Sequence, residues 1–292
     1  MSPVIALLAA MRPRQWTKNL LVFAGLVFAG RFVDPDAIWL VAALFAAFCL
    51  VSSAGYLLND IIDRAGDVNH PEKRLRPIAS GKVSTQTAAC ASAVLLVAGF
   101  AIPLVMGIPC GVQLLTVYAA NQVFYMSAAR RVAILDVFVI SIGFLVRAVA
   151  GAAALRVFIS PWLLVCTFLL ALFLGFAKRK HEYHLVANAR ASLSGYTSQL
   201  LDQFIMISAA ASALSYSVYA IESHTAISHP MLVLTIPFPI FGIFRYLQLV
   251  YKDNGGGNPD QALVKDPWMY GTILLWAVLS LYAVSAEGWV SP

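Results

Sequence analysis

Long apolar runs dominate this chain, and polar residues gather in the connections between them. A helix that crosses a bilayer needs about 20 apolar residues, and only helices and closed barrels satisfy the backbone within lipid. None of the runs shows the alternation expected of a barrel strand. The pattern therefore predicts an all-α, polytopic membrane bundle of about nine transmembrane helices, near residues 19–33, 37–58, 84–106, 108–128, 134–154, 160–177, 199–221, 229–250 and 267–287.

Composition supports a membrane protein and excludes an ordinary soluble domain. The chain is 60% hydrophobic and 12% charged, with a mean hydropathy of +0.79. We expect one transmembrane domain over residues 1–292, without a cleavable signal or an added soluble domain. The four cysteines all lie in apolar segments at spacings that do not suit a metal, which favours buried small hydrophobes.

The basic residues divide unevenly between alternate connections. Sixteen lie at the N-terminus or in the even-numbered connections, against two, Arg31 and Arg156, in or bordering the odd-numbered ones. The positive-inside rule then predicts an inner (cytoplasmic) membrane protein with a cytosolic N-terminus and an extracytosolic C-terminus. This topology, and not nucleic-acid binding, accounts for the net charge of +6. It places the polar connections 59–83 and 178–198, with a Gly-rich linker at 251–266, in the cytosol.

Four polar residues close the second apolar run on what would be one helical face. If the helix continues, Asp60, Asp63 and Asp67 stand at i, i+3 and i+7, directly after Asn59. Three like charges repel, and the macrodipole disfavours acids at a helix C-terminus. Mg²⁺ resolves the conflict, because it takes carboxylate oxygens together with substrate phosphates. The alternative is a solvated helix end whose acids pair with Arg64 and the basic residues that follow.

The arrangement N-D-x-x-D-x-x-x-D at residues 59–67 resembles the first aspartate motif of the UbiA superfamily of intramembrane prenyltransferases. The resemblance covers essentially the whole chain. It includes "RPRQWTKNLLVFAG", "SSAGYLLNDIIDRAGDVNHPEKRLRPIASGKVS" and "AILDVFVISIGFLVRAVAGA", and together these look most like the polyprenyl-phosphate phosphoribosyltransferase branch. The resemblance implies a UbiA-like bundle in which Asp60, Asp63 and Asp67 are catalytic and hold Mg²⁺, with Asn59 as a neutral ligand or an orienting group.

The sequence departs from the superfamily pattern after the sixth apolar run. A second aspartate-rich motif is usual there in enzymes that use a prenyl diphosphate, but this chain reads "FAKRKHEYHL". Lys178, Arg179, Lys180 and Glu182 stand in that place, and cations suit a metal-free phosphate. Lys178, Arg179 and Glu182 become candidate substrate-binding residues. The alternative is an ordinary basic flank of a membrane span.

Further candidate substrate-binding residues lie near the first motif and inside the spans. Intramembrane arginines usually face the bundle interior, which favours Arg147, whereas Arg245 is interpreted as snorkelling to a nearby helix end. Lys18 either snorkels or meets a lipid phosphate, and Tyr125, with Asn121 and Gln122, lines the cavity or bonds between helices. The complete set comprises Lys18, Asn59, Lys73, Arg74, Arg76, Lys82, Tyr125, Arg147, Lys178, Arg179 and Glu182.

The combination of one acidic cluster and two basic clusters favours phosphoribosyl transfer. In this reading the donor is phosphoribosyl pyrophosphate, the acceptor is a polyprenyl (decaprenyl) phosphate held in the membrane, the cofactor is Mg²⁺, and pyrophosphate leaves. The alternative is a prenyltransferase of the same fold that moves a prenyl group from its diphosphate to an aromatic acceptor. A secondary transporter is disfavoured because the chain shows no internal repeat. Homo-oligomerisation is left open.

Overall fold

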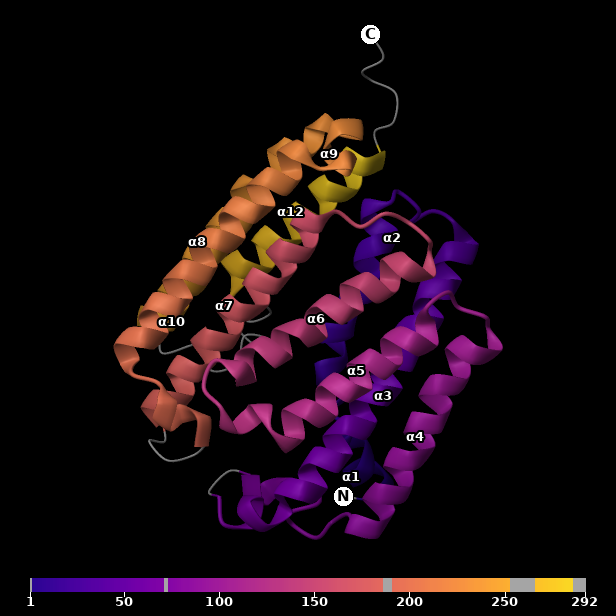
Figure 1. The fold of residues 1–292 in the computed structure, drawn as a ribbon, viewed down its shortest axis with the longest axis vertical. Helices are drawn as coiled ribbons and strands as arrows, with labels where there is room; N and C mark the ends of the chain where they lie inside the picture. Colours follow the sequence, from indigo (N-terminus) through magenta and orange to yellow (C-terminus); the bar gives the residue numbers. More distant parts are fainter. Residues whose placement is uncertain (1, 71–72, 186–190, 253–265, 286–292) are drawn as a thin grey trace. The chain divides into compact units, whose positions relative to one another are not determined.

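A computed structural model describes residues 2–70, 73–185, 191–252 and 266–285 (Figure 1). Parts of the predicted connections 178–198 and 251–266, including Arg190 and Lys265, and the C-terminal residues 286–292 lie outside the described residues. The helical elements are α1 (Pro3–Ala10), η1 (Pro13–Phe23), α2 (Ala24–Phe28), α3 (Pro35–Val68), η2 (Lys73–Leu75), α4 (Thr85–Val105), α5 (Gly111–Ser127), η3 (Ala129–Arg131), α6 (Leu135–Ala154), α7 (Pro161–Leu185), η4 (Ala191–Gly195), α8 (Ser198–Glu222), α9 (His224–Ser228), η5 (Pro230–Thr235), α10 (Pro237–Lys252) and α12 (Pro267–Ser285).

The longest helix, α3, begins with strong local signals and continues well past the predicted apolar run. The Asp34 side chain accepts hydrogen bonds from the backbone N–H groups of Asp36 and Ala37, and Pro35 occupies the first helical position. The helix then runs for 34 residues to Val68. The predicted continuation is thus confirmed, and Asp60, Asp63 and Asp67 do share the helical spacing i, i+3 and i+7.

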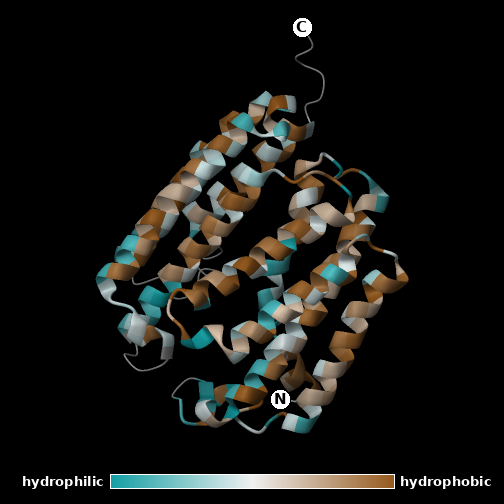
Figure 2. Ribbon diagram, in the orientation of Figure 1, coloured by the Kyte–Doolittle hydropathy of each residue, from teal (hydrophilic) through white to brown (hydrophobic). Residues whose placement is uncertain are grey.

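Seven of the described helices are long and apolar enough to cross a membrane. The all-α membrane fold is confirmed, whereas the count of nine spans is not. The predicted span 19–33 is a 3-10 segment, η1, followed by the short helix α2, and the span 108–128 corresponds to α5, which has 17 residues. In Figure 2, α4 is predominantly hydrophobic, and hydrophilic positions gather in the segment between α3 and α4.

The described chain divides into two compact units. The first comprises Met1–Leu26, Asp34–Met126 and Val146–Val157. Within it α3 packs along α4 and against η1 (Figure 1). A small apolar core, which includes Ala6, Ala10, Leu57, Ile78 and Val83, packs α1 and the α3–α4 connection onto α3. This core holds the N-terminal segment beside the acid-bearing end of α3.

The second unit comprises Val27–Val33, Ser127–Leu145 and Phe158–Pro292. Its helices α7 and α8 pack along one another, and α10 packs against α12 (Figure 1). Its core contains Phe173, Phe176, Leu201 and Tyr246. This unit carries the basic segment at the end of α7. The interpretation of residues 1–292 as a single domain stays a prediction.

Gly151 of α6 lies where another backbone passes very closely. A Cβ atom added there would stand 1.8 Å from the Val22 carbonyl oxygen, so only glycine lets η1 approach α6 in this way. We expect Gly151→Ala to destabilise the protein by about 1–3 kcal/mol, the usual range for overpacking. The measurement is the thermal unfolding midpoint in detergent. Gly271→Ala in α12, where the new Cβ would meet no atom within 4 Å, is the control and should leave the midpoint unchanged or raised. Equal midpoints for both variants would contradict the close approach.

Candidate active site

The acid-bearing end of α3 is partly withdrawn from solvent and neutralised by arginine. Asp60 and Asp67 are 2% and 4% exposed. Arg76, from the segment after α3, places its Nη1 atom 3.1 Å from Asp60 Oδ1 and 2.7 Å from Asp67 Oδ2. Two carboxylates seven residues apart therefore converge on one cationic nitrogen. A low-dielectric setting makes such pairing necessary, because a buried and unpaired carboxylate is costly.

A second arginine reaches the same carboxylate from the N-terminal segment. Arg12 Nη2 lies 2.6 Å from Asp60 Oδ1, and the guanidinium carbon lies 5.0 Å from the centre of the Tyr56 ring. Arg12 adopts a left-handed backbone conformation, with φ of 54°, between α1 and η1. This conformation is uncommon for residues other than glycine. It occurs at the turn that directs the chain toward the acid-bearing end of α3.

The third aspartate has a different partner. Asn59 Nδ2 donates a hydrogen bond of 3.0 Å to Asp63 Oδ2, and the predicted role of Asn59 as a metal ligand or an orienting group stays a prediction. Among the described residues, no group of three or more His, Cys, Asp and Glu side chains is arranged around one point that could hold a metal. Asp60 and Asp67 nevertheless suit a divalent cation, because both are carboxylates and each already neutralises positive charge at this end of α3.

A polar seam continues from this end along the contact between η1 and α3. Trp16 Nε1 donates to Ser53 Oγ at 3.0 Å, and Asn19 Nδ2 donates to Ser52 Oγ at 3.3 Å. Residues 12, 16 and 19 of the N-terminal segment therefore meet residues 60, 53 and 52 of α3, in antiparallel order. The seam sets the register that brings Arg12 to Asp60.

Arg147 is buried at the inner end of this seam. Its Nε atom donates to Asn19 Oδ1 at 2.7 Å, its Nη2 atom donates to the Tyr118 hydroxyl at 2.7 Å, and its guanidinium lies 4.6 Å from the Tyr118 ring centre. The expectation that Arg147 faces the bundle interior is confirmed for this unit. Gln122 also donates to the Tyr118 hydroxyl, but both residues belong to α5, so this bond lies within one helix and not between helices as the sequence had allowed.

The remaining predicted residues of the first unit differ in exposure. Arg74 and Lys82 are exposed, and Lys18, Lys73 and Tyr125 are half-buried. The backbone N–H of Lys73 donates to His70 Nδ1 at 3.3 Å. Of the basic residues that follow α3, Arg76 is the one whose side chain reaches both Asp60 and Asp67.

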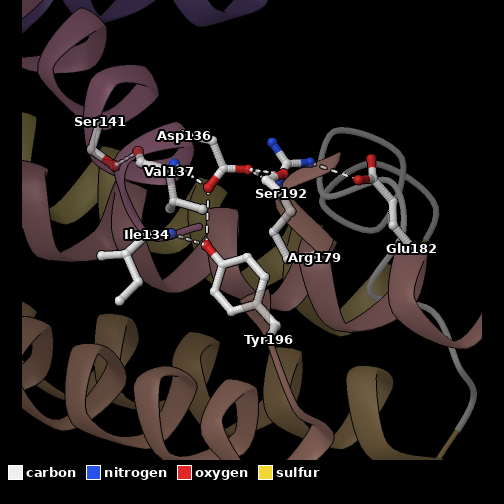
Figure 3. A network of polar contacts seen from close by, with 8 residues as sticks. All are labelled: Ile134, Asp136, Val137, Ser141, Arg179, Glu182, Ser192 and Tyr196. Atoms are coloured by element: carbon white, nitrogen blue, oxygen red, sulfur yellow. Dashed lines mark hydrogen bonds and ion pairs between the residues drawn. The ribbon is translucent and has the colours of Figure 1, made fainter. Parts of the chain in front are cut away.

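The basic segment of the second unit is organised around Asp136, at the start of α6 (Figure 3). Asp136 is fully buried and accepts four hydrogen bonds, from Arg179 Nε at 2.7 Å, Tyr196 OH at 2.9 Å, Ser192 Oγ at 3.0 Å and the Val137 backbone N–H at 2.9 Å. Arg179 Nη1 also donates to Glu182 Oε2 at 2.7 Å. Arg179 is therefore buried between two carboxylates, while Lys178 and Glu182 are half-buried.

Two other cations of this unit pair with acids. Lys180 forms an ion pair with Asp202 and lies 3.7 Å from the centre of the Tyr251 ring. Arg245, interpreted from the sequence as snorkelling to a helix end, pairs with Asp266 through two hydrogen bonds of 3.1 and 2.6 Å. These hydrogen bonds hold the pKa of the Asp266 carboxyl below its ordinary value. Arg245 thereby ties α10 to the start of α12.

Sequence reasoning missed Arg12, Asp136 and Tyr196. For Asp136 a signal was present, since it is a lone acid at the start of an apolar run that contains Arg147. For Arg12 the positive-inside pattern hid the signal, because a basic residue before a first span needs no further explanation. Tyr196 lies in a polar segment, and no neighbouring residue indicates that its hydroxyl bonds to a buried acid.

The described helices define an all-helical, multi-pass membrane protein with an acid-bearing helix end. A solved structure described as a UbiA homologue from Archaeoglobus fulgidus bound to DMAPP and Mg²⁺ aligns with a TM-score of 0.72 over 96% of this chain and 99% of that one. At 14% identity this likeness concerns the fold alone. The model of the UbiA prenyltransferase family matches residues 19–263, and the chain belongs to that family.

Closer relatives by sequence cover nearly the whole chain. The decaprenyl-phosphate phosphoribosyltransferase of Mycolicibacterium smegmatis is 35% identical over 94% of this chain and 90% of its own length. The protein of the same description from Corynebacterium glutamicum is 34% identical over 95% and 86%. The predicted resemblance to the UbiA superfamily and to this branch is confirmed, and the chain is an enzyme, a transferase of that superfamily.

Proposed function

We propose that this enzyme transfers a 5-phosphoribosyl group from phosphoribosyl pyrophosphate to a decaprenyl or related polyprenyl phosphate, with Mg²⁺ as cofactor. The observation that carries the proposal is the similarity to decaprenyl-phosphate phosphoribosyltransferases over 94% of this chain. The acid-bearing end of α3 supports it, because Asp60 and Asp67 already converge on one cationic atom.

The reaction joins two substrates that both carry phosphate. A phosphate oxygen of the polyprenyl phosphate forms a bond to the anomeric carbon of the donor, and the bond from that carbon to the pyrophosphate oxygen breaks. The attacking oxygen is already an anion at neutral pH, so the protein needs no strong general base. Its task is to position both phosphates and to neutralise the leaving pyrophosphate.

The residues of the α3 end suit the diphosphate of the donor. Asp60, Asp63 and Asp67 would hold Mg²⁺, and Asn59 orients Asp63 through its hydrogen bond. When bound, the metal would supply positive charge against the departing pyrophosphate. Arg76 stands beside two of these carboxylates and is placed to donate to the same phosphate oxygens.

The remaining phosphates, on C5 of the donor and on the lipid, need cationic partners without a metal. We assign this part to the basic residues Lys18, Lys73, Arg74, Lys82, Arg147 and Lys178, with Tyr125 as a hydrogen-bonding group. Arg179 and Glu182 bond to one another, and Asp136 fixes Arg179 from the other side, so this pair orders the segment that carries Lys178. The supporting observation is the basic sequence at the end of α7, where prenyl-diphosphate enzymes carry acids.

The test offers two substrate pairs to one preparation of purified enzyme. Radiolabelled phosphoribosyl pyrophosphate with decaprenyl phosphate and Mg²⁺ is expected to yield a labelled lipid, and a chelator should abolish the product. A prenyl diphosphate with an aromatic acceptor is expected to yield none. Turnover of only the second pair would replace the proposal with prenyl transfer, the activity after which the family is described.

We also propose that the chain lies in the cytoplasmic membrane with its N-terminus in the cytosol, so that its water-soluble donor meets the acid-bearing end of α3. The supporting observation is the excess of basic residues at the N-terminus and in alternate connections. Phosphatase reporters inserted after Gly107 and after Gly81 should be active and inactive, respectively, and the reverse pattern would invert the topology.

A further inference from the structure

We propose that Arg12 is an exchangeable counter-ion that holds Asp60 in the metal-free enzyme and moves to the diphosphate of the donor when a divalent cation binds. This inference rests on the proposed function, since it assigns Arg12 to the same acid-bearing end of α3. It adds a donor-binding residue that lies on the N-terminal segment, 48 residues before Asp60 in the chain.

The first support is the crowding of one carboxylate oxygen. Arg12 Nη2 and Arg76 Nη1 both bond to Asp60 Oδ1, at 2.6 and 3.1 Å. A carboxylate oxygen has two lone pairs, so these two contacts fill it. A divalent cation that takes this oxygen as a ligand must therefore displace at least one guanidinium. Arginine and the metal therefore compete for Asp60 Oδ1, and each weakens the binding of the other at that atom.

The second support distinguishes the two arginines. Arg76 has a second carboxylate partner, Asp67 Oδ2, at 2.7 Å, so a cation that takes Asp60 Oδ1 leaves this ion pair in place, and Asp67 has a second oxygen to offer the metal. Arg12 has one carboxylate partner among the described residues, and its side chain is 29% exposed, which leaves it room to turn. The ring of Tyr56 lies 5.0 Å from its guanidinium carbon and gives it a second, uncharged support. Arg12 is thus the residue that exchanges.

The third support is that Arg12 is not needed to attach the N-terminal segment to α3. Trp16 and Asn19 already bond to Ser53 and Ser52, and Ala6 and Ala10 pack into the apolar core beside Leu57. Yet Arg12 holds a left-handed φ of 54°, an uncommon backbone state that persists where surrounding structure imposes it and that clusters at functional sites. A released guanidinium next to a diphosphate is well suited to bidentate bonding.

The experiment measures Mn²⁺ and pyrophosphate binding to the full chain in detergent, without turnover. Mn²⁺ binding is followed by electron paramagnetic resonance, and pyrophosphate binding by calorimetry at saturating Mn²⁺. For Arg12→Gln we expect Mn²⁺ alone to bind about tenfold more tightly and pyrophosphate to bind about tenfold more weakly, each about 1.4 kcal/mol. Arg14→Gln removes the same charge from an exposed neighbour and should change either affinity less than twofold.

The opposite signs of the two shifts separate exchange from a structural role. A merely structural ion pair would change neither affinity, or would weaken both together with the thermal midpoint. Arg12→Lys is a second variant in case the glutamine variant does not fold. Lysine keeps the positive charge but lacks the two-pronged guanidinium that bonds a phosphate through two N–H groups. It should bind pyrophosphate at least threefold more weakly than wild type.

Each outcome bears on one proposal. If the wild-type enzyme binds neither Mn²⁺ nor pyrophosphate in the presence of Mn²⁺, the proposed function itself is contradicted. Suppose that the wild-type enzyme binds both ligands. An Arg12→Gln variant whose affinity for Mn²⁺ or for pyrophosphate is unchanged would then overturn the proposed exchange of Arg12 but not the proposed function. Shifts of the same size in Arg14→Gln would have the same consequence.

Discussion

The Asp60→Asn enzyme is expected to transfer the phosphoribosyl group at least about a thousandfold more slowly than wild type, while keeping its helical fold. Asp60 is buried, and its Oδ1 atom lies where two cationic groups already converge. The amide carries no charge, so it is a far weaker ligand for Mg²⁺. A metal supplies several kcal/mol of transition-state stabilisation, and every 1.36 kcal/mol lost is a tenfold fall in rate.

The measurement is the initial rate of labelled lipid formation at saturating donor, accompanied by circular dichroism. Asp36→Asn is the matched control, because it removes an exposed acid from the first turn of the same helix and should leave the rate within about twofold. An Asp60→Asn enzyme that retains more than a tenth of the wild-type rate would show that this carboxylate holds no essential metal.

Asp136→Ala is expected to lower the free energy of unfolding by about 3–5 kcal/mol, the range for removing one partner of a buried ion pair. The substitution strips Arg179 Nε of its carboxylate and leaves the hydroxyls of Ser192 and Tyr196 without their acceptor. It would also loosen the segment between α7 and α8, because Ser192 and Tyr196 attach that segment to the start of α6 (Figure 3).

Denaturant titration in detergent provides the measurement, with Glu182→Ala as the control. Glu182 is the other carboxylate on Arg179, but its side chain is 25% exposed, so its loss should cost about 1 kcal/mol or less. Tyr196→Phe, which removes one of the four bonds to Asp136, should fall between the two variants, near 1–2 kcal/mol. Equal costs for Asp136→Ala and Glu182→Ala would mean that the buried network does not stabilise this unit.

The sequence predicted most helices because their signals are local. Apolar length marked the spans. Asp34 followed by Pro35 is a further local signal, for the start of α3, that the predicted span from residue 37 did not use. The prediction was weakest at 19–33, where the chain forms a 3-10 segment and a short helix. Hydropathy reports only that a segment is apolar. The close contact of Gly151 with the Val22 carbonyl, a tertiary feature, is invisible in that pattern.

For the acidic and basic clusters, too, the sequence predicted the local features and not the long-range partners. Asp60, Asp63 and Asp67 share a helical face by periodicity alone, and the family resemblance follows from that motif and the segments around it. Their partners could not be predicted. The sequence did not distinguish among the four basic residues that follow the aspartates, Lys73, Arg74, Arg76 and Lys82. The packing of the chain brings Arg76 to two of the acids. Arg179 was interpreted as a phosphate ligand, and the structure shows it buried between Asp136 and Glu182.

The sequence by itself determined the class of protein, the all-helical membrane fold, the family and the register of the aspartate face, because hydrophobic length, helical period and motif are written in neighbouring residues. Only the tertiary structure decided which charges meet. Arg12 lies 48 residues from Asp60, and Tyr196 lies 60 residues from Asp136. Long side chains reach many partners, and the one chosen depends on which backbone segments are packed together and on which carboxylates that packing withdraws from water.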